Sequence, residues 1–528
     1  MSNHAYESAA ALRPSSNGPI PISTLCERFS LTPASAEDAA ALNDLSTLGV
    51  SVDSGDTAAG ELFVGLPGFT VHGARFAAQA VASGAVAVLT DADGAQIVHQ
   101  TAPGTPVLVH SDPRAVVGPL SAEVYHHPAR GLVTTAVTGT NGKTTTAYFL
   151  DAILSAHVGG CMVAGTVELR VGERSVESPR TTVEAPVLQR MMALAVEDKV
   201  GAASLEASSH AIVLHRLDGI VVDVAGFTNL QRDHLDFHKT MEGYLEAKAQ
   251  LFTPEHARRG VVCVDDQWGA ALAAEAPIEI DRVRAYPGET PADWWVSDAA
   301  VSLTDSATTF TLHGPDGEKI EASCPLPGLV NVQNAALALV MAIRAGVPAA
   351  TAAAALAGAH NIPGRMQRIS QRDGRRGLCI VDFAHTPDAM ELALKAVRPI
   401  TPGRLIVVFG SDGDRDQGKR PMLGEVCARL ADVLVVTDEN PRSEDPQLIR
   451  NAILEGVRGV RPDLTDVEEI TTWRGDAVRR GVELCGPDDT VIVTGKGHEP
   501  FLEMAGEFIR YNDAPVMAEA VEEKWGRA

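Results

Sequence analysis

A lysine followed by three threonines, directly after a glycine-containing turn, is the part of this 528-residue sequence best suited to phosphate chemistry. The turn reads Gly139-Thr140-Asn141-Gly142-Lys143-Thr144-Thr145, between a β-branched run over 133–138 and a helical pattern over 147–154. In a strand–loop–helix arrangement, loop amides and the helix N-terminus face an anion, the lysine adds positive charge, and the Thr144 hydroxyl can reach magnesium. Val137 stands where the full eight-residue pattern has its first glycine, so an ordinary strand-to-helix turn is the alternative. The flanking pattern favours nucleotide binding.

Two further apolar runs end in residues that could bind a metal ion or a phosphate. Residues 202–205 precede Glu206, and residues 222–230 lead to His234. Apolar runs alternate here with helical patterns, which predicts a largely parallel sheet with helices on both faces. Ligands of such sheets sit beyond the carboxyl ends of the strands, so we expect Thr144, Glu206 and His234 to meet near a magnesium ion. A solvent-facing strand end for Glu206 and a helix-capping role for His234 are the alternatives.

Charged side chains also follow three apolar runs in the C-terminal third of the chain. The runs cover residues 404–410, 432–437 and 490–494. The loops after them carry Arg415, Arg442, Lys496 and Glu499. Arginine pairs with carboxylates in a bidentate manner, and a carboxylate beside it would hold an ammonium group. Such a pocket would suit an amino acid, whereas a set of solvated loop tips is the alternative.

The alternating strand and helix patterns that position these residues predict an α/β protein. We expect three domains, because 528 residues are too many for one core. We expect a disordered, Ser/Asn/Pro-rich tail over 1–20 and a small mixed α/β domain over 21–129. A P-loop-type ATPase domain would follow over 130–362, and a Rossmann-like domain over 363–528. The boundary at 362 falls after an alanine-rich helical pattern.

Composition restricts the classes of partner. The net charge of −24 argues against sequence-independent electrostatic binding of the whole surface to nucleic acid or to anionic lipid. No run approaches the length of a membrane span, and the polar N-terminus has no secretory signal pattern. The seven cysteines show neither metal-type nor disulfide-type spacing. We therefore expect a cytoplasmic protein with reduced cysteines and no membrane insertion.

Taken in order, these residues closely resemble the Mur ligases, ATP-dependent amide-forming enzymes of peptidoglycan precursor synthesis. The resemblance extends from about Ser51 to Asp513. Its motifs are GTNGKTT at 139–145, EASSH at 206–210, TNLQRDHLDFH at 228–238, NVQN at 331–334, PGRM at 363–366, DFAHTPD at 382–388, GDRDQGKRP at 413–421, ENPR at 439–442 and GKGHE at 495–499.

The resemblance implies that the first domain binds the uridine nucleotide of a muramyl substrate, the second binds ATP, and the third binds an amino acid. Its best match is the branch that adds meso-2,6-diaminopimelate to UDP-N-acetylmuramoyl-L-alanyl-D-glutamate, with a role in cell wall biogenesis, cell shape and cell division. The D-glutamate carboxylate would attack the γ-phosphate of ATP, and the incoming amine would attack the acyl phosphate to release phosphate. Magnesium would assist, and the enzyme would be a monomer acting on small molecules.

Site roles follow from the same resemblance, position by position. Asn331, Arg365 and His385 would contact ATP together with residues 139–145. Lys248 matches a lysine that is carbamylated in the family, and its carbamate would join Thr144, Glu206 and His234 around magnesium; from sequence alone it would be a solvated helix residue. The positions matching muramyl-substrate contacts are Ser54, Phe69, Thr70, Val71, Thr181, Thr182, Ser208 and Arg216. Those matching diaminopimelate contacts are Arg415, Glu439, Asn440, Pro441, Arg442, Gly495 and Glu499.

Several positions depart from the family pattern. Gly55, Val183, Asp412 and Glu439 stand where the family usually has Arg, Pro, Gly and Asp. A lysine-adding ligase is the nearest rival, which Arg442 disfavours because lysine has no distal carboxylate. The D-alanyl-D-alanine-adding ligase and folylpolyglutamate synthase share the ATP loop. They should, however, lack the pair of motifs at 439–442 and 495–499. A non-catalytic paralogue that binds nucleotide or muramyl peptide, and a P-loop motor or transporter, are the alternatives from other classes.

Overall fold

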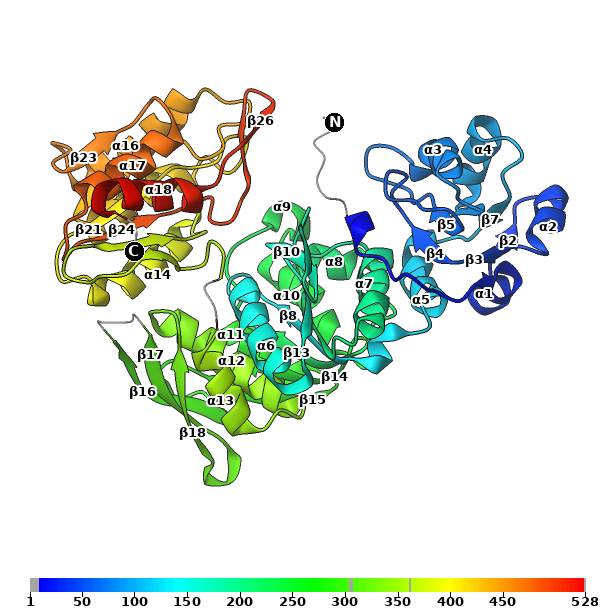
Figure 1. The fold of residues 1–528 in the computed structure, drawn as a ribbon, viewed down its shortest axis with the longest axis horizontal. Coiled ribbons are helices and arrows are strands. Elements are labelled where there is room, and N and C mark those ends of the chain that lie inside the picture. Colours follow the sequence, from blue (N-terminus) through cyan, green and yellow to red (C-terminus); the bar gives the residue numbers. More distant parts are fainter. Residues whose placement is uncertain (1–8, 303–306, 360–361, 527–528) are drawn as a thin grey trace. The chain divides into compact units, whose positions relative to one another are not determined.

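The computed structural model describes residues 9–302, 307–359 and 362–526, which form two compact units (Figure 1). The first unit contains Met1–Trp294 and Leu337–Ala355, and the second contains Trp295–Ala336 and Leu356–Ala528. Strands and helices alternate along both units, so the predicted α/β class is confirmed.

The N-terminal part of the first unit is a small mixed sheet in the order β2-β7-β6-β5-β4. Strands β4 to β7 are parallel, and β2 is antiparallel to β7. The strands are β2 Thr32–Pro33, β4 Gly49–Ser51, β5 Glu61–Val64, β6 Ala87–Thr90 and β7 Val107–Val109, while β1 Ile20–Pro21 pairs with β3 Ser46–Thr47. The helices are α1 Ile22–Phe29, α2 Ala36–Leu42, η2 Gly73–Phe76, α3 Ala77–Ala82, α4 Ala92–Thr101, α5 Pro113–Val124 and η3 Pro128–Gly131.

The segment before this sheet is ordered from Ala9, so the prediction of a disordered 1–20 tail is wrong for residues 9–20. Ala9–Ala11 forms the short helix η1, and Leu12 is fully buried in the central hydrophobic cluster. Arg13 pairs with Asp56 and Glu61. Ser15 and Ser16 also donate hydrogen bonds to Glu197, so long-range contacts hold the segment although its composition is polar. Residues 1–8 lie outside the described part of the chain.

The central sheet of the first unit has the strand order β11-β10-β9-β12-β8-β13-β14-β15. Strands β9, β12, β8, β13, β14 and β15 are parallel, whereas β10 and β11 are antiparallel. The bounds are β8 Val133–Thr138, β9 Cys161–Ala164, β10 Glu168–Val171, β11 Arg174–Glu177, β12 Ala202–Glu206, β13 Val222–Phe227, β14 Ala257–Cys263 and β15 Glu279–Arg284. Runs buried on both faces, such as β12, are typical of parallel sheets.

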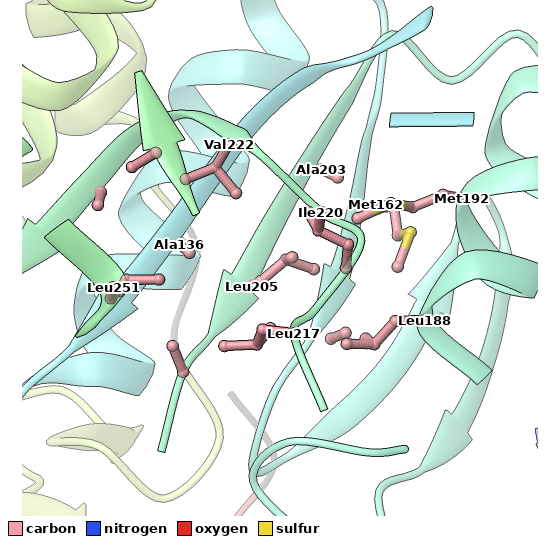
Figure 2. Close-up of a cluster of buried hydrophobic side chains, with 14 of the residues drawn as sticks. Ala136, Met162, Leu188, Met192, Ala203, Leu205, Leu217, Ile220, Val222 and Leu251 are labelled. Atoms are coloured by element: carbon pink, nitrogen blue, oxygen red, sulfur yellow. The ribbon is translucent and has the colours of Figure 1, made fainter. Parts of the chain in front are cut away.

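Helices cover this sheet and bury its core. Figure 2 shows part of one cluster, in which Leu188 and Met192 of α7 join Met162 of β9 and Leu205 of β12. The helices are α6 Lys143–Val158, α7 Ala185–Glu197, α8 Ser209–Val213, α9 Leu235–His238, α10 Met241–Ala249, η4 Gln250–Phe252 and α11 Gln267–Glu275. Helices α12 Leu329–Arg344 and α13 Ala349–Ala357 belong in part to each unit.

The second unit contains an antiparallel meander and a second sheet, drawn in green and in yellow to red in Figure 1. The meander consists of β16 Trp294–Val301, β17 Thr308–His313 and β18 Lys319–Cys324, with η5 Pro315–Gly317. The sheet order is β19-β20-β24-β21-β22-β23, parallel except at β19.

The sheet of the second unit is built from short buried strands joined by helices. Its strands are β19 Gln367–Ser370, β20 Leu378–Val381, β21 Leu405–Phe409, β22 Val433–Val436, β23 Val467–Glu469 and β24 Thr490–Val493, and the hairpin β25 Phe501–Met504 with β26 Glu507–Arg510 follows. Its helices are α14 Pro387–Val397, η6 Arg398–Ile400, α15 Lys419–Leu430, α16 Pro446–Val460, α17 Arg474–Leu484 and α18 Asp513–Trp525. Strands β21, β22 and β24 point the same way, so their following loops share one edge.

Candidate active site

The phosphate-type loop lies where the sequence predicts it, between strand β8 and helix α6. Gly139 has φ of 145°, and a Cβ there would lie 1.9 Å from Oγ1 of Thr228. Gly142 has φ of 90° directly before the helix. The amides of Thr140 and Asn141 donate to the backbone and side-chain oxygens of Asn229, at 2.9 and 3.1 Å. Both glycines are therefore required by the geometry of this turn.

Lys143 folds back over the loop. Its Nζ donates to the carbonyl oxygens of Gly139 and Thr140, at 3.0 and 2.9 Å. These weak neutral acceptors keep the ammonium at the mouth of the loop, at the N-terminus of α6. The helix dipole and the lysine thus add positive potential at one point, which suits a phosphate.

Glu206 ends strand β12, and Thr144 lies in the first turn of helix α6, which follows the neighbouring strand β8. Glu206 of β12 is in register with Val137 of β8, so its side chain emerges beside the loop. Oγ1 of Thr144 donates to Glu206 at 3.0 Å, and Thr166 donates to the same carboxylate from its amide and its hydroxyl, at 2.8 and 2.9 Å. The predicted meeting of the loop and Glu206 at one sheet edge is confirmed.

This pair offers the oxygen donors that magnesium prefers. A buried carboxylate and a threonine hydroxyl, completed by water and phosphate oxygens, form a usual magnesium environment. The residues therefore fit the ion. Within the described residues no group of three or more His, Cys, Asp or Glu side chains could hold a metal on its own, so protein ligands alone do not make a closed site.

His234 stands in a group of rings after β13. It has φ of 51° and precedes helix α9. Its ring meets that of His210 edge-on at 4.8 Å, and the rings of His238 and Tyr244 stack at 4.8 Å. Phe227 at the end of β13 is in register with Thr138, which brings this segment to the same sheet edge as the loop.

Lys248 is buried, so the interpretation of it as a solvated helix residue is wrong. Only 1% of the residue is exposed. Its Nζ donates to the carbonyl oxygen of Gly139 at 2.7 Å and lies 4.5 Å from the ring centre of Tyr244. Burial, followed by the charge of Lys143, lowers the pKa of Lys248 well below its usual range. Burial of Lys248 beneath the phosphate loop thus favours the neutral form of its amine.

The expected muramyl-peptide residues gather near Glu206. Oγ1 of Thr182 donates to the backbone oxygen of Glu206 at 2.7 Å and accepts from the amide of Ser208 at 3.0 Å. Arg216 donates to the backbone oxygen of Thr182 at 3.2 Å, and Thr181 receives a hydrogen bond from Thr166 at 3.2 Å. The hydrogen bonds therefore connect all four positions to Glu206. Thr182, Ser208 and Arg216 are linked to its backbone oxygen, and Thr181 is linked to its carboxylate through Thr166.

The expected uridine residues lie in the N-terminal sheet. Ser54 is buried and donates to Gln79 at 3.1 Å. The turn at Phe69, Thr70 and Val71 is exposed, and Phe69 is 90% exposed. An exposed aromatic ring beside a polar loop is suited to a nucleobase. The roles of these residues remain predictions.

Three expected ATP residues belong to the second unit. The amide side chain of Asn331 in α12 donates to Pro327 at 2.8 Å. The Arg365 guanidinium lies 4.3 Å over the Phe383 ring, and Nδ1 of His385 lies 2.9 Å from the Phe383 backbone oxygen. Arg365 and His385 are thus brought together on one aromatic residue.

Several residues expected to bind the incoming amino acid form a hydrogen-bonded group in the loops after β22 and β24. Lys496 is fully buried, and its Nζ donates to Asn440 at 2.9 Å and to Glu499 at 3.0 Å. Asn440 in turn donates to Glu499 at 3.1 Å. Pro441 is buried beside Gly413, whose amide donates to the Asn440 backbone oxygen at 2.8 Å.

Glu439 lies deeper in this group. It is buried, and a Cβ on Gly495, whose φ is 107°, would lie 2.5 Å from its Oε2. Burial and the nearby Asp412 raise the pKa of Glu439 to about 8. Arg442 is partly buried, with Nη2 3.9 Å from Asp412 and Nε 3.8 Å from Glu503. Arg415 lies instead on an exposed loop.

Three family models match consecutive stretches of the chain. "Mur ligase family, catalytic domain" matches residues 48–125, "Mur ligase middle domain" matches 137–342, and "Mur ligase, glutamate ligase domain" matches 364–497. A relative from Streptomyces avermitilis, named UDP-N-acetylmuramoyl-L-alanyl-D-glutamate--2,6-diaminopimelate ligase, is 43% identical over 92% of this chain and 94% of its own.

The chain belongs to the Mur ligase family.

Further relatives of this Mur ligase support the assignment over nearly the whole length. A protein of Leifsonia xyli subsp. xyli, named UDP-N-acetylmuramyl-tripeptide synthetase, is 42% identical over 95% of this chain and 96% of its own. A solved diaminopimelate ligase matches with a TM-score of 0.64 and 31% identity, over 91% of this chain and 96% of that one. MurF from Acinetobacter baumannii shares the fold, with a TM-score of 0.66 at 19% identity over 96% and 99% of the two chains.

A buried ion pair of this Mur ligase is absent from the sequence predictions. Arg474 and Asp513 are both inaccessible, with contacts of 2.9 and 2.7 Å. Arg474 also donates to the backbone oxygens of Asp438 and Thr494, at 2.9 and 2.8 Å, and so ties the two acceptor loops together. No local pattern marks it, because its partners are far apart in sequence. Among the described helices, none combines the length and apolarity that crossing a bilayer requires.

Proposed function

We propose that this Mur ligase is an ATP-dependent ligase that joins meso-2,6-diaminopimelate to UDP-N-acetylmuramoyl-L-alanyl-D-glutamate, releasing ADP and phosphate, in peptidoglycan precursor synthesis. The names of relatives from Streptomyces avermitilis and Corynebacterium efficiens, and of the solved structure at 31% identity, support this substrate pair. The observation that carries the proposal is the phosphate-type loop with Glu206 hydrogen-bonded to Thr144.

The reaction needs positive charge where a carboxylate meets a polyanion. The D-glutamate carboxylate oxygen forms a bond to the γ-phosphorus of ATP while the bond to the β–γ bridging oxygen breaks. Lys143 and the N-terminus of α6 are suited to stabilise the charge that builds up on the transferred group. The acceptor amine then attacks the acyl carbon, loses a proton, and displaces phosphate. Turnover therefore requires no oxidant or reductant.

Thr144 and Glu206 are the residues best suited to hold magnesium, with His234 and a carbamate of Lys248 as further ligands. When bound, the ion neutralises charge on the phosphate oxygens. A carbamate forms when a neutral amine attacks carbon dioxide and releases one proton. The buried Lys248, with its lowered pKa, meets the requirement for a neutral amine. The new carboxylate would also convert a poor metal ligand into an oxygen donor.

We assign residues 21–129 to the uridine nucleotide, 130–362 to ATP, and 363–528 to the acceptor. Ser54 and residues 69–71 would bind the nucleotide, while Thr181, Thr182, Ser208 and Arg216 would bind the muramyl peptide. Asn331, Arg365 and His385 would contact ATP together with residues 139–145. Action on soluble nucleotides is consistent with a cytoplasmic monomer.

In the acceptor pocket, Arg442 would receive the distal carboxylate of diaminopimelate. The other residues of the diaminopimelate-binding set would be Arg415, Glu439, Asn440, Pro441, Gly495 and Glu499. A guanidinium facing lysine would remain unpaired, which disfavours the lysine-adding alternative.

The test is phosphate release from ATP with the muramyl dipeptide nucleotide and one of three acceptors: meso-diaminopimelate, L-lysine or D-alanyl-D-alanine. We expect turnover with diaminopimelate alone. Turnover with lysine would reassign the pocket. Absence of turnover with every acceptor would favour a non-catalytic binder of nucleotide or muramyl peptide.

A further inference from the structure

The acceptor pocket contains a carboxylate at a position where the family usually has glycine. Oδ2 of Asp412 lies 3.9 Å from Nη2 of Arg442, which is too far for a hydrogen bond but close for an ion pair. The chain therefore places a negative group beside the guanidinium proposed to bind the distal carboxylate.

Asp412, Glu439 and Arg442 each have one buried polar atom with no hydrogen-bond partner among the described residues. These atoms are Oδ1 of Asp412, Oε2 of Glu439 and Nε of Arg442. Two of the three atoms are acceptors and one is a donor. Buried polar atoms normally have partners, and an unpaired one is costly. A ligand group with both an ammonium and a carboxylate would satisfy all three.

The surrounding contacts hold these residues in position. Arg420 donates to the Asp412 backbone oxygen at 3.1 Å and pairs with Glu444 at 2.7 Å. The neighbouring Gly413 leaves no room for a side chain, since a Cβ there would lie 1.9 Å from the Pro441 oxygen. The backbone of the loop after β21 is thus held against residues 440–442, which fixes the position from which the Asp412 side chain projects.

Diaminopimelate carries such a group at its far end, where one carbon bears an ammonium and a carboxylate. We propose that Asp412 is a further specificity-determining residue, which binds the distal ammonium of the acceptor beside Glu439 of the diaminopimelate-binding set while Arg442 binds the distal carboxylate. This inference rests on the proposed function, because it specifies how that acceptor is chosen. The raised pKa of Glu439 is consistent with it, since an ammonium ion would favour the ionised carboxylate.

The rival explanation is that Asp412 only orients Arg442. The two explanations differ for an acceptor that keeps the distal carboxylate but lacks the distal amine, namely L-2-aminopimelate. A purely orienting Asp412 would matter equally for both acceptors, because both use Arg442. An ammonium-binding Asp412 would matter only for diaminopimelate.

The experiment compares the full chain with Asp412→Asn, which keeps the shape and removes the charge. Titration calorimetry measures the Kd of meso-diaminopimelate, L-2-aminopimelate and L-lysine, with the muramyl dipeptide nucleotide and a non-hydrolysable ATP analogue present. Steady-state phosphate release measures turnover separately. We expect the wild type to prefer diaminopimelate over L-2-aminopimelate by about 10–100-fold, the range of a charged hydrogen bond. In Asp412→Asn this preference should fall to within about threefold, with L-2-aminopimelate unaffected.

A second variant and a control keep the result interpretable. Glu439→Gln should reduce the same preference, while Asp416→Asn, an exposed carboxylate of the same loop, should leave it unchanged. Thermal melting establishes that each variant folds. An Asp412→Asn variant that weakens both acceptors equally, or neither, overturns the inference.

The outcomes also separate the inference from the proposed function. Turnover with diaminopimelate and an unchanged preference in Asp412→Asn would keep the function and remove the inference. Loss of the preference in calorimetry without turnover by the wild type would keep the inference and remove the function. Tighter wild-type binding of L-lysine than of diaminopimelate would overturn both.

Discussion

Lys143 and Lys248 donate hydrogen bonds to the same carbonyl oxygen, that of Gly139, at 3.0 and 2.7 Å. Two ammonium groups on one neutral acceptor would repel each other at short range. Lys143 is only partly buried, whereas Lys248 is fully buried, so burial and the charge of Lys143 lower the pKa of Lys248. Gly139 of the phosphate loop thereby contacts both Lys143, the cation suited to the nucleotide, and Lys248, the amine suited to carbamylation.

Replacing Lys248 with alanine should reduce turnover by about 100-fold or more, because a preorganised charge near the phosphates would be lost. A small added carboxylic acid should restore part of the rate. Carbon-13 NMR after exposure to labelled bicarbonate should show a carbamate signal in the wild type and none in Lys248→Ala. Lys199→Ala, at an exposed position, is the control. Near-normal turnover without the added acid would contradict the carbamate.

Replacing Arg442 with alanine should raise the KM for diaminopimelate by tens- to thousands-fold, because truncating one partner of a buried charge pair costs about 2–5 kcal/mol. The KM for ATP should stay the same. Steady-state kinetics with diaminopimelate varied measure the effect, with Arg458→Ala, at an exposed position of helix α16, as the control. If the KM does not change, the acceptor binds elsewhere.

Glu439 should make stability depend on pH. Its pKa is raised from 4.5 to about 8 in the folded chain, so folding favours the protonated acid. The stability it contributes is present below pH 4.5 and is lost as the pH rises through about 8. Relative to the wild type, Glu439→Gln should therefore gain melting temperature between pH 5 and about 8, as its folded state has no charge to bury. A difference in melting temperature that is constant over this window would refute the raised pKa.

Breaking the inaccessible pair of Arg474 and Asp513 should destabilise the C-terminal domain strongly. Arg474→Met leaves Asp513 buried and unpaired, which typically costs about 3–5 kcal/mol. Arg479→Met removes an exposed pair with Glu519 and Glu523, worth about 0–1 kcal/mol, and is the matched control. Urea unfolding of both variants measures the difference. Equal midpoints would mean that the buried pair contributes little.

The parts of the site that follow strand ends could be predicted from the sequence, and the parts set by packing could not. The loop at 139–145 and Glu206 follow β-branched runs, and parallel strands necessarily bring their carboxyl ends together. Lys248 is flanked by Glu242 and Glu246 on its helix, so its local pattern indicates solvent. Its burial depends on the docking of α10 against Gly139, far away in sequence. The burial of Leu12 could not be predicted for the same reason, because its neighbours in the core cluster are far away in sequence.

The ordered segment around η1 also constrains the sequence of folding events. Ala9 accepts a hydrogen bond from Arg190, 181 positions later, and Leu12 belongs to the core cluster of the central domain. On a ribosome, residues 9–12 emerge before these partners and must therefore remain undocked until the partners have been synthesised and folded. The small N-terminal sheet can form in the meantime, because its strands pair among themselves. Residues 9–12 thus reach their native position only after the central domain has folded, although they precede that domain in the chain.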